Sequence, residues 1–156
     1  MSPAWIYPLR DLTETPLPDG SPILRPAVPI LIPEKDPVHF GVLDSGSPIS
    51  VTSRRFARQA GIDLDAALPV MEVPLGLAAR FDRLPVFEIN LKLRAPDSSD
   101  TVSWNLHVAV RPTWNFPFEV LFGQRGWFDS FTTTFGTGHL AVEPEATFGD
   151  RFRTSA

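Results

Sequence analysis

The segment FGVLDSGSPISVTS, residues 40–53, places a carboxylate at the end of an apolar run. The run before Asp44 predicts a buried strand, where a charge without partners is costly. Hydroxyl and glycine residues follow at once, as Ser45, Gly46 and Ser47. A carboxylate with such neighbours can exchange a proton with a reacting group, which makes Asp44 the first candidate for acid–base chemistry.

Asp-Ser-Gly alone is also good turn chemistry, because aspartate side chains accept hydrogen bonds from nearby main-chain N–H groups. Neither Asp82 nor Asp129 has neighbours as suggestive as those of Asp44. Asp63 and Asp65 have the composition of a solvated loop around them. The surroundings of Asp44 therefore decide between a simple turn and a site.

Those surroundings resemble the active-site signature of the retropepsin-like aspartic proteases. The matching residues are Val42, Leu43, Asp44, Ser45, Gly46, Ser47 and Val51. The stretch SRRFARQAGI, residues 53–62, is similar to the short helix after that family's active-site loop. FEVLFGQRGWFDSFTTTF, residues 118–135, is similar to its apolar-apolar-Gly segment, short helix and final strand. The resemblance covers residues 24–143 and is closest to the small, mostly bacterial single-domain members.

The resemblance implies an endopeptidase that needs no cofactor and uses Asp44 as its catalytic aspartate. Two carboxylates share one proton and hold a water, because two like charges in contact cannot both ionise cheaply. Ser45 would donate its hydroxyl across the centre, Gly46 would let main chain approach, and Ser47 could hydrogen-bond the carboxylate. The chain contains a single Asp-Ser-Gly. The pair then requires a homodimer in which each copy contributes Asp44.

A hairpin that covers the peptide substrate, a flap, is implied for MEVPLGLAARFDRLP, residues 71–85, with Leu75, Gly76 and Leu77 near its tip. This hairpin has less glycine than many flaps of the family. Gln124 also stands where many members have an arginine that braces the domain. These departures leave open a second hypothesis, a retropepsin-like module that binds peptide or dimerises without hydrolysing anything.

Composition narrows the other classes of function. A length of 156 residues is typical of one domain. A hydrophobic content of 43% is typical of a folded protein. The net charge of -4 argues against a surface that binds phosphate groups. We expect no nucleic-acid partner. The absence of cysteine excludes disulfides and thiol nucleophiles. The three histidines, His39, His107 and His139, lack metal-site spacing, so we predict no metal. Without a signal-peptide pattern or a membrane-length apolar run, we expect cytoplasmic localisation and no membrane contact.

The fold class expected is all-β: a retropepsin-like acid protease barrel with one or two short helices. Proline-rich residues 1–22 suggest an extended arm, residues 23–145 the retropepsin-like domain, and residues 146–156 a tail. Prolines within residues 23–33 favour an edge strand there.

Local patterns predict the individual elements. Ser53 is a typical N-cap and Gly61 a typical stop, so a two-turn helix is expected between them. Apolar and polar residues alternate from Phe87 to Arg94 and again from Val102 to Arg111, which predicts a hairpin. A closing hairpin is expected over residues 132–144, and residues 124–131 have room for a short helix.

Overall fold

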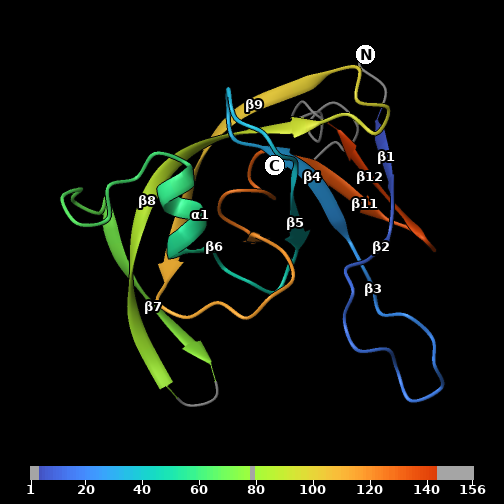
Figure 1. Ribbon diagram of the computed structural model, residues 1–156, viewed down its shortest axis with the longest axis horizontal. Helices are drawn as coiled ribbons and strands as arrows, with labels where there is room; N and C mark the ends of the chain where they lie inside the picture. The colour runs from blue at the N-terminus through green and yellow to red at the C-terminus, as the bar shows by residue number, and fades with distance from the viewer. Residues whose placement is uncertain (1–3, 78–79, 144–156) are drawn as a thin grey trace, which may run out of the picture.

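The computed structural model describes residues 4–77 and 80–143, with the main chain alone at residues 77, 80 and 81. One helix, α1 (Arg54–Gln59), lies among these residues (Figure 1). The strands are β1 (Trp5–Pro8), β2 (Arg10–Asp11), β3 (Leu24–Arg25), β4 (Ala27–Leu31), β5 (His39–Leu43), β6 (Ser50–Ser53), β7 (Met71–Leu77), β8 (Arg80–Arg94), β9 (Thr101–Arg111), β10 (Val120–Phe122), β11 (Thr132–Phe135) and β12 (His139–Glu143).

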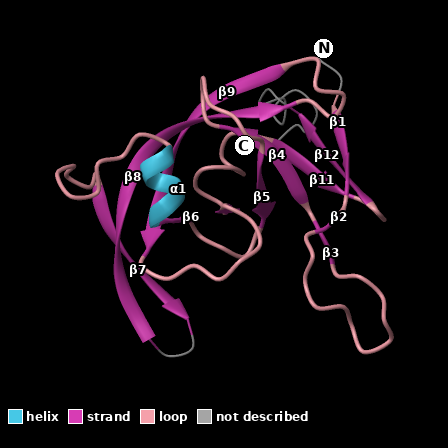
Figure 2. Ribbon diagram, viewed as in Figure 1, coloured by secondary structure: helices cyan, strands magenta, loops and turns pink. Residues whose placement is uncertain are grey.

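The largest sheet has the strand order β4-β5-β10-β6-β9-β8-β7, and an additional β4–β8 pairing closes its first six strands into a barrel. The all-β prediction is therefore confirmed, as the strands in Figure 2 show. β7 lies outside the closed part and pairs only with β8 in this sheet. The barrel thus carries one hairpin that extends beyond its wall.

The prediction of an edge strand in residues 23–33 is wrong. β4 pairs with β5 on one side, and its residues Ile30 and Leu31 pair with Leu93 and Lys92 of β8 on the other. Pro29 takes part only in the pairing with β5. A proline lacks an N–H donor. Because the contact with β8 begins after Pro29, this missing donor does not prevent barrel closure.

The long β8–β9 hairpin follows the alternation in the sequence. The predicted hairpin is confirmed, with a register that pairs Phe87 with Val108 and continues to Arg94 opposite Thr101. Alternate residues of β8, such as Ile89 and Leu91, are buried in the core. β8 also begins earlier than the pattern suggested, because residues 80–86 pair with β7 instead of β9 over most of their length.

The predicted helix and its signals are confirmed in α1. The hydroxyl of Ser53 accepts a hydrogen bond from the N–H of Phe56 at 3.0 Å, which satisfies a free donor of the first turn. Phe56 is fully buried, and Gly61 has a φ of 97° just after the last turn. Residues 124–131 form hydrogen-bonded turns and no second helix.

Both ends of the described chain meet in a second sheet, of three strands in the order β1-β12-β11. The predicted closing hairpin is its β11–β12 pair. β1 lies within the proline-rich segment and pairs with β12, placing Tyr7 opposite Leu140. Tyr7 is buried in the main core, and its hydroxyl donates to the carbonyl oxygen of Arg94 at 2.7 Å. Residues 5–8 therefore pack against the body of the protein.

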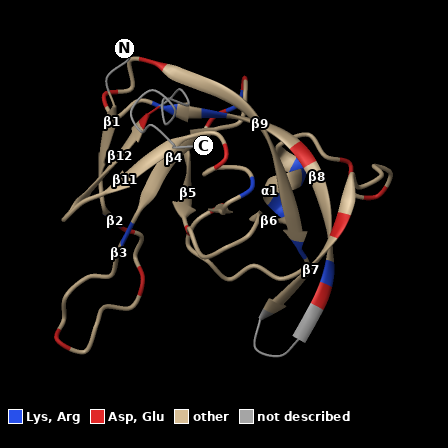
Figure 3. Cartoon of the chain, turned by 180° about the vertical axis from the view of Figure 1, so that it is seen from behind, with Lys and Arg blue, Asp and Glu red and all other residues tan. Residues whose placement is uncertain are grey.

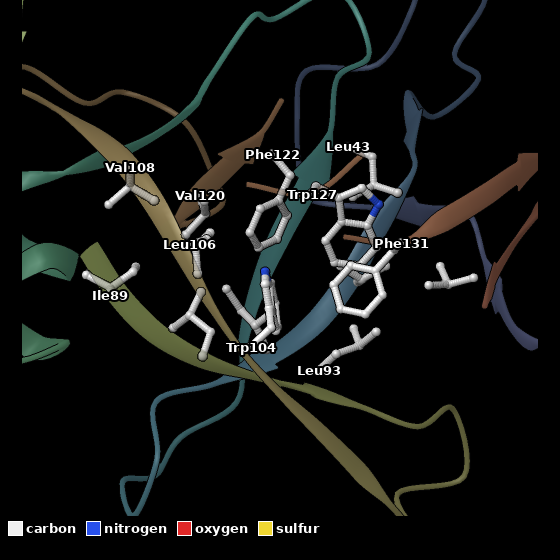
Figure 4. Packing of buried hydrophobic residues seen from close by; sticks show 14 of the residues in the cluster. Leu43, Ile89, Leu93, Trp104, Leu106, Val108, Val120, Phe122, Trp127 and Phe131 are labelled. Carbon is white, nitrogen blue, oxygen red and sulfur yellow. The ribbon is translucent and has the colours of Figure 1, made fainter. Parts of the chain in front are cut away.

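Aromatic rings fill the centre of the barrel (Figure 4). Trp127 is fully buried, and its ring centroid lies 4.5 Å from that of Phe131 and 5.0 Å from that of Phe122. Trp104 packs edge-on against Trp127, and its indole N–H donates to the carbonyl oxygen of Gly126 at 2.9 Å. These rings tie the segment after β10 to the barrel interior.

Replacing Trp127 with alanine is expected to lower the free energy of unfolding by about 3–5 kcal/mol, because it removes a fully buried ring and leaves a cavity. Leu68→Ala is the control, since Leu68 is 89% exposed. Its expected effect is under about 0.5 kcal/mol. Urea unfolding of both variants measures the difference. A loss below about 1 kcal/mol in Trp127→Ala would contradict the central position of this ring.

Candidate active site

Asp44 is the first residue after β5, and its main chain is fixed in the barrel. Leu43, just before it, pairs with Phe122 of the parallel strand β10, and the N–H of Asp44 donates to the carbonyl oxygen of Phe122 at 2.8 Å. The side chain of Asp44 is exposed, so the prediction that it lies on a buried strand is wrong. The strand ends at the buried Leu43, one residue before the carboxylate. Asp44 is therefore open to solvent or to a ligand.

A tight turn shapes the loop that carries Asp44. Its carboxylate oxygen Oδ1 accepts the N–H of Gly46 at 3.0 Å, and its carbonyl oxygen accepts the N–H of Ser47 at 3.1 Å. A Cβ at Gly46 would lie only 3.2 Å from Oδ1. The hydroxyl of Ser47 donates to the carbonyl oxygen of Ile49 at 2.7 Å, and not to the carboxylate as predicted. Ser47 thus stabilises the turn instead of the charge.

A second segment, immediately after β10, holds this loop in place. The main-chain N–H of Gln124 donates to the carbonyl oxygen of Ser47 at 2.8 Å, and its side-chain amide donates to that of Ser45 at 2.6 Å. The N–H of Arg125 donates to the carbonyl oxygen of Pro48 at 3.1 Å. Gln124 therefore braces the loop through its own amide. A glutamine side chain carries amide N–H donors. The identity of residue 124 was therefore a signal for this hydrogen bond, although the resemblance implied an arginine at that position.

The two segments touch at main-chain distance. A Cβ added to Gly123 would lie 2.6 Å from the carbonyl oxygens of both Ser47 and Ile49. Ser50 links them further, since its hydroxyl donates to the carbonyl oxygen of Arg125 at 2.9 Å and accepts the N–H of Gly123 at 3.1 Å. Only glycine fits at this contact without displacing a neighbour.

Asp44 lies on a cavity of about 760 Å³, which Gly46 and Ser47 also line. Leu75 and Gly76 of the predicted flap line the same cavity. They belong to the β7–β8 hairpin, which projects from the barrel in Figure 1. Leu77 pairs with Arg80 through the main chain, and neither the side chain of Leu77 nor residues 78–79 are among the described parts. The structure thus places two of the three flap candidates beside the loop of Asp44.

An aromatic wall, formed by Trp114, Phe116 and Phe118, lines the same cavity. The rings of Phe116 and Phe118 are stacked with centroids 5.1 Å apart, and the indole N–H of Trp114 donates to the carbonyl oxygen of Phe118 at 2.7 Å. Phe118 is buried, whereas Phe116 is 44% exposed. The prolines among these rings, which disfavour regular strand pairing, were a signal for a loop.

Charged groups surround the cavity as well. Arg25 lines it while forming an ion pair with Glu14, with an N–O distance of 3.0 Å. Asp82 and Arg111 also line it. Figure 3 shows charged residues of both signs on the β7–β8 hairpin and positive residues on α1.

Within residues 4–77 and 80–143, no three acidic or histidine side chains are grouped to hold a metal ion. The described helix is too short to cross a membrane.

Comparison with solved structures finds a similar architecture. A retropepsin-like aspartic protease from Rickettsia conorii matches 89% of this chain and 90% of its own, with a TM-score of 0.52 and 10% sequence identity. The chain has a retropepsin-like fold. This similarity confirms the predicted resemblance and the retropepsin-like fold. At 10% sequence identity it does not show which chemistry the residues of this chain perform.

Two other solved structures match less of the chain. The foamy viral protease-reverse transcriptase in complex with an RNA/DNA hybrid covers 64% of this chain and 11% of its own, with 14% identity and a TM-score of 0.40. The retroviral protease-like domain of Ddi1 from Leishmania major covers 64% and 71%, with 17% identity and a TM-score of 0.40. No family model and no curated protein matches the sequence.

Gly123→Ala is expected to lower the free energy of unfolding by about 1–3 kcal/mol, because a methyl group cannot fit between two carbonyl oxygens. Gly136→Ala is the matched control, since its Cβ would lie 3.6 Å from the nearest oxygen, an ordinary contact. We expect that control to change stability by less than about 1 kcal/mol. Chemical unfolding of the two variants measures their free energies of unfolding. Equal stabilities would mean that the loops do not touch in solution.

Proposed function

We propose that this protein is an aspartic endopeptidase whose catalytic pair consists of Asp44 from each of two identical chains. The observation that carries the proposal is the setting of Asp44. Its carboxylate is exposed, its loop is fixed by hydrogen bonds, and it shares a cavity with Leu75 and Gly76 of the projecting hairpin. An accessible, oriented acid beneath a hairpin is what peptide hydrolysis by this route requires.

The reaction needs no group beyond two carboxylates and a water. One carboxylate is ionised and takes a proton from the water, whose oxygen attacks the peptide carbonyl carbon. The protonated partner donates to the carbonyl oxygen, giving a tetrahedral intermediate. Its collapse breaks the C–N bond, and a proton passes to the leaving amine. The shared proton belongs to the pair, so activity follows the titration of the pair and not of one residue.

The second carboxylate comes from a second copy. Each chain has one Asp-Ser-Gly, and Asp44 faces outward from the end of the barrel strand β5. A twofold axis beside this loop would bring the two copies of Asp44 together, because a twofold interface places the same surface of each chain against its counterpart. Asp82 lines the same cavity as Asp44. It lies on the β7–β8 hairpin, however, and not on the loop whose position is fixed by the contact at Gly123.

The substrate would be an extended peptide with apolar side chains. Leu75 and Leu84 from the hairpin, together with Leu121 from β10, line the cavity. The aromatic wall adds a large apolar surface beside them. Burying a substrate side chain of leucine or phenylalanine size there would contribute about 1.5–3 kcal/mol to binding.

Cleavage of a mixed peptide library by the wild type, Asp44→Asn and Asp82→Asn tests the proposal from about pH 3 to pH 7, a range over which a carboxyl pair loses its shared proton. Asp44→Asn is expected to lose activity by about a thousandfold or more, because the pair can no longer transfer protons. Asp82→Asn is the control from the same cavity and keeps activity within about tenfold. Cleavage that survives unchanged in Asp44→Asn would sink the assignment.

Solution mass on the same samples completes the test. The wild type and Asp44→Asn are both expected to be dimers, because the substitution leaves the size of the side chain unchanged. A folded wild-type dimer that cleaves nothing across this pH range would favour the alternative, a peptide-binding or dimerisation module. A strictly monomeric wild type with Asp44-dependent activity would contradict the two-chain pair.

A further inference from the structure

A second cavity, of about 300 Å³, lies apart from the one at Asp44. Its wall comes from β1, β2, β4, β5 and the end of the β8–β9 hairpin, and it shares no lining residue with the first cavity. Two arginines, Arg10 and Arg94, line it, and no acidic residue does. In a chain with 18 acidic and 14 basic residues, such a concentration of positive charge marks a place for an anion.

Arg10 is held ready for a ligand. Its guanidinium carbon lies 4.7 Å from the centroid of the Phe40 ring, a cation–π contact that restrains the group. The Nε atom of Arg10 is buried and has no hydrogen-bond partner among the described residues. It is the only such buried side-chain atom in residues 4–77 and 80–143. A buried donor without an acceptor is costly, and an anion that binds the rest of the guanidinium from the cavity would offset that cost.

Arg94 brings the second positive charge. Its Nε donates to the hydroxyl of Ser98 at 2.8 Å, and its Nη2 contacts the same oxygen. Ser98 lines the cavity too. Neither Arg94 nor Arg10 forms an ion pair within the described part of the chain. No carboxylate of the described residues therefore neutralises either charge, and the guanidinium donors that Ser98 does not occupy can meet the oxygens of a ligand carboxylate.

The remaining wall is apolar and rich in proline. Pro8, Pro29 and Pro96 line the cavity together with Val38 and Ala95. Prolines have no N–H, so this wall presents apolar carbon and little else that binds polar groups. A bare inorganic ion would leave that surface uncovered. The cavity fits a ligand with an apolar body and one acidic group.

We propose that this cavity binds a small organic carboxylate, with its acid group held by Arg10 and Arg94 and its apolar body against the proline wall. The acid group could belong to a free carboxylic acid or to the carboxyl terminus of a peptide, which present the same chemistry. The site stands independently of the peptidase proposal, because it contains none of the residues around Asp44.

Titration followed by main-chain NMR shifts tests the site with two matched pairs of probes. The first pair is N-acetylphenylalanine and its amide, and the second is an acetylated tripeptide ending in phenylalanine and its amide. Both acids are expected to shift the signals of Arg10, Phe40 and Arg94. The amides have no negative charge and are expected not to bind up to about 10 mM. Tighter binding of the tripeptide acid would assign the site to peptide ends, and equal binding to free acids.

Variants locate the contact. Arg94→Gln and Arg10→Lys are each expected to weaken binding of the acid about tenfold, since each loses charge-assisted hydrogen bonds of the arginine type. Arg83→Gln is the control, because Arg83 is exposed on the β7–β8 hairpin and does not line this cavity. Equal binding of acid and amide to the wild type would overturn the proposal without any variant. Undiminished binding in both arginine variants would overturn it as well.

Discussion

The contact of Gly123 with the carbonyl oxygens of Ser47 and Ile49 is the constraint on which the site depends. Main chain meets main chain there, and a single methyl group would force the two segments apart. Because they are this close, the amide groups of Gln124 reach the carbonyl oxygens of Ser45 and Ser47. The loop that presents Asp44 is thus held by main-chain contacts, to which the side-chain amide of Gln124 adds one hydrogen bond.

The barrel brings these segments together through the direction of its strands. β5 and β10 are parallel neighbours, so their carboxyl ends lie at the same end of the barrel, and Asp44 and Gly123 each follow directly. The aromatic core also anchors the segment that follows Gly123. Trp127 lies four residues beyond Gly123 in the aromatic centre, and the indole N–H of Trp104 binds the carbonyl oxygen of Gly126. Packing energy in the barrel therefore also stabilises the position of the loops.

Local signals in the sequence predicted much of this structure. The cap at Ser53 and the alternation after Phe87 are properties of short stretches, and both appear as expected. Features set by distant contacts were missed. The exposure of Asp44 depends on where β5 ends, and the second pairing of β4 depends on Leu93, more than sixty residues away. The hydroxyl of Ser47 had two acceptors within reach in sequence, and only the folded turn selects the carbonyl oxygen of Ile49.

The central claim is that two chains complete one catalytic pair, and mixing experiments test it most directly. Wild type and Asp44→Asn are combined in equal amounts under conditions that allow subunits to exchange, and peptide cleavage is measured per total protein. If both copies of Asp44 are needed, only wild-type pairs are active, and activity falls to about one quarter of that of the pure wild type. Activity of about one half would show that each chain works alone and would contradict the account.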